Sequence, residues 1–191
     1  MSKGFLESWL EIPTAGSAVT NSTTQASLFT GVTGSQPTLP AGYFERTGKP
    51  LWLRLYGRIS TVVTSPGTLN LTCRFGSIDV FDSGAMTLNT TAQTNVQWML
   101  DVMLFARALG SGTNGNVAGV GHFLSGAVIG AAAVGSGGAT SQMTPYNTAP
   151  GTAGNGFDTT AAQLIDIQAK WSTANASNSI RLEAGVIGLF N

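Results

Sequence analysis

Hydrophobic and polar side chains alternate with a period of two residues in the middle of the chain. Between Leu51 and Ile59 the odd positions hold leucine, glycine or isoleucine, and the even positions hold tryptophan, tyrosine or arginine. Residues 69–75 alternate in the same way, and Ser65-Pro66-Gly67 separates the two stretches. Such alternation places one set of side chains on each face of a strand. The pattern predicts two strands joined as a β-hairpin.

Four later segments have the same period, at residues 96–106, 117–128, 165–171 and 180–188. The second of them is interrupted by glycine, which predicts a bulged or bent strand. The third also permits a helix, because Leu164, Ile167 and Trp171 have helical spacing. Its β-branched residues and the small polar residues that follow it favour a strand.

Seven to nine strands without alternating helices predict an all-β domain. We expect a jelly-roll-like antiparallel β-sandwich of about eight strands, with an immunoglobulin-like sandwich as the alternative. A chain of 191 residues fits one such domain. We place the sandwich at residues 27–191 and an N-terminal arm at residues 1–26.

The arm contains a short apolar segment that ends at Pro13. Its apolar side chains have near-helical spacing, which predicts a short amphipathic helix. They are Phe5, Leu6, Trp9, Leu10 and Ile12. Two interpretations follow: the helix docks on a partner protein, or it folds back and caps its own sandwich.

The chain has few charges, and they cancel. Charged residues make up 9% of the sequence, against about 25% in an average protein. Nine basic residues balance nine acidic ones, and the basic residues do not cluster. This argues against nucleic acid and against an anionic membrane as partners. A polar, uncharged surface loses little solvation when it packs against a neighbour.

Hydrophobic runs are too short for membrane insertion. No apolar stretch reaches the roughly 18 residues of a membrane-spanning helix. No long apolar segment follows Met1 either, so we expect no signal peptide and synthesis in a cytoplasm.

The residues that usually carry catalysis are scarce. His122 is the only histidine, and Cys73 is the only cysteine. Residues 110–115 match a glycine-rich nucleotide motif, but the sequence after them does not predict the helix that the motif needs. Asp79 and Asp82 are too few for a calcium loop and suit turns. We therefore expect no catalytic site, no metal and no cofactor.

One strand face carries a candidate interface. Trp52, Arg54, Tyr56 and Arg58 alternate with the buried leucines and share a face. Tryptophan, tyrosine and arginine are the residues that most often anchor protein interfaces. A solvated face and a sugar-binding site are the alternatives, and the second would lose sugar binding on Trp52→Ala.

Both ends of the predicted domain resemble a group of small β-sandwich virion proteins of bacteriophages. In residues 164–183 a strand ends at Trp171, and a small polar turn leads to Asn178-Ser179-Ile180 and a final strand, similar to the closing hairpin of that group. Near the start, residues 27–31 and 40–44 precede the strong strand at Leu51 in a similar way. The resemblance spans residues 27–191, implies a location in the virion and carries over no functional residues.

These observations together predict a structural protein of a bacteriophage particle and not an enzyme. We expect a capsid decoration, or cement, protein that forms a homo-oligomer, with a trimer favoured. It would bridge subunits of the major capsid protein or bind another virion protein. The alternative is a tail or fibre module that binds host surface glycans.

Overall fold

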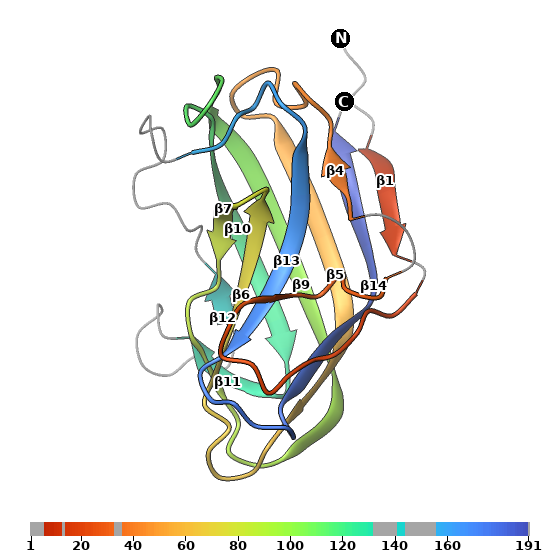
Figure 1. Ribbon diagram of the computed structural model, residues 1–191, viewed down its shortest axis with the longest axis vertical. Coiled ribbons are helices and arrows are strands. Elements are labelled where there is room, and N and C mark those ends of the chain that lie inside the picture. The colour runs from red at the N-terminus through yellow and green to blue at the C-terminus, as the bar shows by residue number, and fades with distance from the viewer. Residues whose placement is uncertain (1–5, 13, 33–35, 132–140, 144–155, 191) are drawn as a thin grey trace.

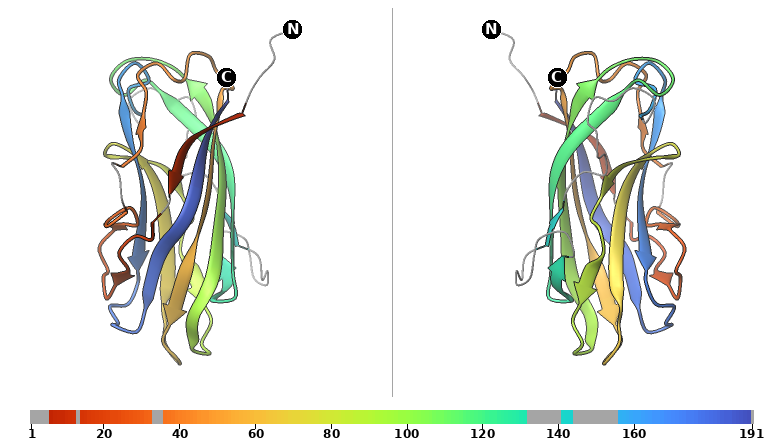
Figure 2. Two further views of the ribbon diagram at one scale, coloured as in Figure 1. Left: turned by 90° about the vertical axis from the view of Figure 1, so that its right-hand side faces the viewer. Right: turned by 90° about the vertical axis from the view of Figure 1, so that its left-hand side faces the viewer.

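The protein is an all-β sandwich of two sheets, as predicted. The computed structural model describes residues 6–12, 14–32, 36–131, 141–143 and 156–190. These residues form fourteen strands and no helix. The strands make two antiparallel sheets that pack face to face (Figure 1, Figure 2).

The first sheet contains the four longest strands. Its order is β1 (Leu6–Ile12), β14 (Ser179–Phe190), β5 (Pro50–Thr61), β9 (Gln93–Ala108), β10 (Asn116–Ser125) and β12 (Ser141–Met143). The short strand β2 (Val19–Thr20) also pairs with β14.

The second sheet is built around β6 and β13. Its order is β11 (Val128–Ala131), β8 (Met86–Leu88), β6 (Thr68–Phe75), β13 (Gln163–Trp171) and β3 (Ala26–Ser27). In addition, β4 (Thr38–Leu39) pairs with β13, and β7 (Ile78–Asp82) pairs with β6.

The strand order is that of a jelly roll. If eight strands are counted along the chain as β1, β3, β5, β6, β8, β9, β13 and β14, the first sheet has the order 1-8-3-6 and the second has 2-7-4-5. These interleaved orders come from two Greek keys, which define the jelly roll. Along the chain, strands β10, β11 and β12 lie between the sixth and seventh of these eight strands, and they extend the two sheets.

Alternating side chains build the core, as the period of two predicts. Leu51, Leu53 and Leu55 on β5 are fully buried, and so are Leu69 and Leu71 on β6. Inward aromatic rings fill the space between the sheets. They include Trp98, Phe123, Phe75 and Trp171. A buried side chain of this size stabilises the fold by about 1.5–3 kcal/mol.

The predicted hairpins are wrong, although their strands are right. β5 and β6 lie in different sheets, and the connection 62–67 crosses between the layers. The same holds for β13 and β14, which are joined by residues 172–178. Alternation with a period of two shows that one face of each strand is buried. It does not show to which of the two sheets the strand belongs, because the strands of both sheets bury one face.

The predicted N-terminal helix is also wrong. Leu6–Ile12 is strand β1, which pairs antiparallel with β14 and places Ile12 opposite Gly185. A helix of seven residues is unstable alone, whereas a strand gains backbone hydrogen bonds along the edge of a sheet. The backbone of the arm thus folds back on its own sandwich, in line with the second interpretation. Phe5 lies outside the described residues, and docking of the arm on a partner stays a prediction.

Candidate functional site

The outer face of the second sheet is polar, and part of it is covered. Residues 22–27 run across β13, where Ser27 donates a 2.6 Å hydrogen bond to Asp166. Gln25 reaches Thr72, which is only 1% exposed. Polar groups on this face are therefore bonded to one another and to the N-terminal segment.

The outer face of the first sheet is different, because aromatic and aliphatic side chains line it. Its register aligns Trp52 of β5 with Met103 of β9, and Met103 with Val120 of β10. Phe105 lies one row further along the same face of β9. We call these four residues the apolar patch. Val120 is 61% exposed, while the other three are half-buried.

An ionic row lies beside the apolar patch. Arg54 donates two hydrogen bonds to Asp101, one of them 2.6 Å long from Nε. The indole N–H of Trp52 donates to the other oxygen of Asp101 at 3.0 Å, and the Arg54 guanidinium lies 4.8 Å from the centre of the Trp52 ring. The hydrogen bonds with Asp101 raise the pKa of Arg54 above its ordinary value. The charges of this row are thus paired within the chain.

Beyond the ionic row the face is hollowed. The hollow has a volume of about 410 Å³. Side chains that line it are Tyr56, Arg58, Gln97, Met99, Leu124 and Glu183. Tyr56, Met99 and Leu124 form an aromatic and aliphatic wall. Arg58, Gln97 and Glu183 form a charged and amidic wall.

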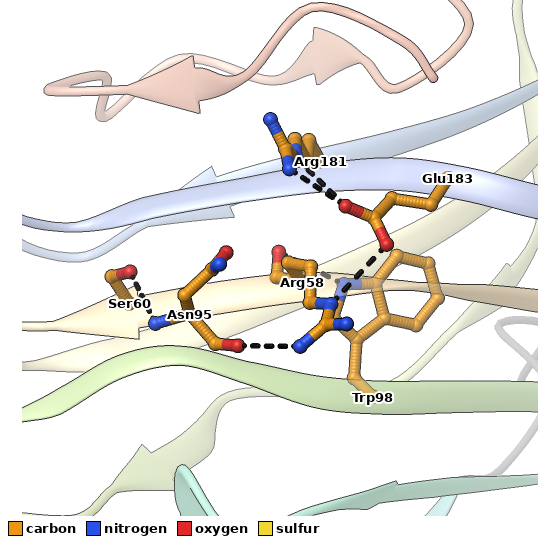
Figure 3. Close-up of polar contacts among 6 residues, drawn as sticks. All are labelled: Arg58, Ser60, Asn95, Trp98, Arg181 and Glu183. Atoms are coloured by element: carbon orange, nitrogen blue, oxygen red, sulfur yellow. Dashed lines mark hydrogen bonds and ion pairs between the residues drawn. The ribbon is translucent and has the colours of Figure 1, made fainter. Parts of the chain in front are cut away.

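A β-bulge places Glu183 at the hollow. The register between β14 and β5 shifts between Leu182 and Ala184, which makes Glu183 the additional residue. Bulges redirect a side chain in this way. The register also puts Arg58 directly opposite Arg181, which would be repulsive without a counter-charge. Glu183 bonds to both, at 3.2 Å from Nε of Arg58 and at 2.7 Å from Nη2 of Arg181 (Figure 3).

Asn95 holds Arg58 from the other side. Its carbonyl accepts a 3.0 Å hydrogen bond from Nη1 of Arg58, and its own N–H donates to Ser60 Oγ (Figure 3). The φ angle of Asn95 is 56°, a left-handed conformation that asparagine tolerates better than most residues. Arg58 is therefore held at two of its three guanidinium nitrogens, Nε and Nη1.

The backbone beneath the hollow is tightly packed. Trp98 lies inside the sandwich and donates its indole N–H to the carbonyl of Arg58 at 3.2 Å. Gly57 leaves space for this ring, since a Cβ there would come within 2.5 Å of Trp98 and 2.0 Å of the Arg181 carbonyl. A glycine is required at this position for steric reasons.

The structure divides the predicted interface residues into two groups. Trp52 and Arg54 share Asp101, whereas Tyr56 and Arg58 line the hollow. Sequence reasoning missed Asp101 and Glu183 as their partners. Asp101 was recognisable as an outward charge on its own strand, but only the register reveals what it faces.

The remaining residues with side chains or motifs typical of catalysis are His122, Cys73 and the glycine-rich loop at residues 110–115. His122 is exposed, opposite Asp101. Cys73 is buried and unpaired, and its burial raises the pKa of the thiol. In the glycine-rich loop, Gly112 donates to Asp158, and the segment after the loop is strand β10.

Two further findings concern only the described ranges. They contain no group of three or more histidine, cysteine, aspartate or glutamate residues that could hold a metal ion. No helix in them has the length and apolar character needed to cross a membrane.

Comparison with protein-family models, with curated proteins and with solved structures finds no match for this chain.

Proposed function

We propose that this chain is a non-enzymatic structural protein of a bacteriophage particle, of the capsid decoration type. The observation that carries the proposal is the apolar patch on the outer face of the first sheet. Contiguous exposed apolar surface is typical of protein–protein contacts. On the second sheet the exposed apolar side chains Leu164 and Ile129 lie on different strands, β13 and β11, and polar side chains and residues 22–27 occupy the described face around β13 and β6.

The composition of the face supports contact with another protein. Its side chains include Trp52, Phe105 and Met103, and aromatic residues and methionine are enriched in interfaces. Covering the face would bury Arg54 and Asp101 as a bonded pair, which avoids the large cost of a buried unpaired charge.

The partners follow from the symmetry of a capsid. Copies of the chain would pack through the patch around a closed symmetry axis to form a homo-oligomer, with a trimer favoured. The oligomer would then attach to the major capsid protein or to another virion protein. On a repeating shell, many weak contacts of this kind add up to stable attachment. The low overall charge and the resemblance to small phage virion proteins support this location.

The experiment is to determine the protein content of phage particles that carry the gene for this chain. Particles are purified by density gradient, and the chain is quantified by mass spectrometry against the major capsid protein. We expect a fixed ratio between the two across independent preparations. Absence of the chain from intact particles would contradict the proposal.

A further inference from the structure

The hollow is separated from the apolar patch on the same sheet face. Arg54 and Asp101 lie between them, and Trp52 and Tyr56 are four residues apart along β5. At the rise of an extended strand this corresponds to about 13 Å. A partner centred on the apolar patch therefore leaves a chemically different site beside it.

One wall of the hollow suits the apolar face of a sugar ring. Tyr56 is 41% exposed and Leu124 is 46% exposed, and Met99 lies between them in the register. An exposed aromatic ring beside aliphatic side chains offers a flat apolar surface. The C–H groups of a pyranose ring can stack on such a surface, while its hydroxyl groups point to the rim.

The other wall offers both donors and acceptors. Nη2 of Arg58 and the carboxamide of Gln97 have no hydrogen-bond partner among the described residues, and both residues line the hollow. The Glu183 carboxylate and the Gln97 oxygen are acceptors. Hydroxyl groups both donate and accept, so a polyol matches this mixed set better than a ligand with donors alone or acceptors alone.

The charges at the hollow favour a neutral ligand. An anionic group bound by Arg58 would lie close to the Glu183 carboxylate, which is 3.2 Å from Arg58 Nε. A cation bound by Glu183 would in turn meet Arg58 and Arg181 (Figure 3). Like charges at such distances oppose binding.

The polar wall is held in place before any ligand arrives. Glu183 is fixed by two arginines, and Arg58 is fixed by Glu183 and by the Asn95 carbonyl (Figure 3). Side chains that are already ordered lose little entropy on binding. A volume of about 410 Å³ also lies within the range of small-molecule sites, about 300–1,000 Å³.

From these features we infer that the hollow is a binding site for a neutral saccharide. Tyr56 stacks on a pyranose ring, and Arg58, Gln97 and Glu183 bind its hydroxyl groups. This gives the protein a ligand in addition to its proposed protein contacts. It also locates the sugar contact at Tyr56 rather than at Trp52.

The test measures binding of defined trisaccharides to the full chain by isothermal titration calorimetry. The neutral probes are tri-N-acetylchitotriose, maltotriose and cellotriose, and the charged probe is tri-galacturonic acid. We expect saturable binding of at least one neutral trisaccharide and weaker binding of the charged one. Tyr56→Ala should weaken the binding about tenfold, which corresponds to the loss of one stacking contact.

Two further variants separate the site from its surroundings. Gln97→Ala removes an exposed polar group without disturbing the core and should also weaken binding. Leu164→Ala should leave the affinity within about twofold, because Leu164 is an exposed side chain of the second sheet and does not line the hollow. The inference is overturned if no neutral trisaccharide binds, if Tyr56→Ala keeps full affinity, or if tri-galacturonic acid binds most tightly. Lack of binding together with dissociation of the oligomer in Tyr56→Ala would assign the hollow to a second copy instead.

Discussion

At the scale of single residues, the sheet face depends on positions where the backbone departs from a regular strand. Glu183 is the additional residue of a bulge, and Asn95 has a positive φ angle. Both lie next to Arg58 and bind it. Gly57 contributes in another way, because its missing side chain leaves room for Trp98. The irregular residues Glu183 and Asn95 thus hold the Arg58 guanidinium in place.

Cys73 leads to a prediction about pH. Burial is the largest cause of its raised pKa, and the neighbouring Asp166 and Asp79 raise it further. An unfolded thiol ionises near pH 8.5, whereas the folded thiol stays protonated above that pH. The unfolded state therefore loses a proton first, and stability falls as the pH rises above about 8.5. The expected slope from this group is up to about 1.4 kcal/mol per pH unit.

The measurement is urea unfolding of the wild type and of Cys73→Ala between pH 7.5 and pH 10. Cys73→Ala will be less stable than the wild type at pH 7.5, because it leaves a cavity in the core. Its free energy of unfolding should decline less steeply above pH 8.5 than that of the wild type. Parallel pH profiles would show that the thiol ionises in the folded protein as easily as in the unfolded one.

At the scale of the strands, alternation predicted which segments are extended but not how they pair. Residues 165–171 are extended, as predicted, because their β-branched side chains favour a sheet over the helix that their spacing also permits. The apolar spacing of the arm fits a helix, and the sequence does not show the edge of β14 with which the arm pairs instead. Alternation also predicts which residues of one strand share a face, as it does for Trp52, Arg54, Tyr56 and Arg58. Their partners on β9 and β14 depend on register and on a bulge, which a single sequence does not specify.

Asn178 links two of the connecting segments that cross from one sheet to the other. It is fully buried in the β13–β14 connection, where its Oδ1 accepts from Val62 N–H at 2.9 Å and its Nδ2 donates to the Pro66 carbonyl at 3.0 Å. Val62 and Pro66 belong to the β5–β6 connection. One side chain therefore ties the two connections together at one end of the sandwich.

We predict that Asn178→Ala destabilises the protein by roughly 2–4 kcal/mol, because two backbone groups lose their partners inside the protein. Chemical denaturation followed by tryptophan fluorescence measures this loss. The control is Asn175→Ala, which removes only a local turn hydrogen bond to the Ser177 N–H. Its cost should stay near 1 kcal/mol or below. Equal effects of the two substitutions would contradict the role of Asn178.

At the scale of the whole molecule, the two faces of the sandwich have different surroundings. Polar side chains and residues 22–27 occupy the outer side of the second sheet. The first sheet exposes an apolar patch, an internally paired ionic row and a hollow. Net charge is zero, so long-range repulsion does not oppose association of identical copies. The asymmetry of the faces is the physical basis for expecting self-association through the first sheet.

Val120→Asp tests that expectation directly. Val120 is the most exposed side chain of the apolar patch, so an aspartate there is solvated in the monomer and leaves the fold intact. In an oligomer packed through this patch, the new carboxylate would be buried without a partner, which costs about 3–5 kcal/mol. The dissociation constant of self-association should therefore rise at least a hundredfold in sedimentation velocity measured over a range of concentrations. The matched control is Leu164→Asp, which makes the same kind of change at a 40% exposed leucine of the second sheet and should leave association unchanged. A wild type that stays monomeric at every concentration, or an equal response of the two variants, would exclude the apolar patch as the oligomer interface.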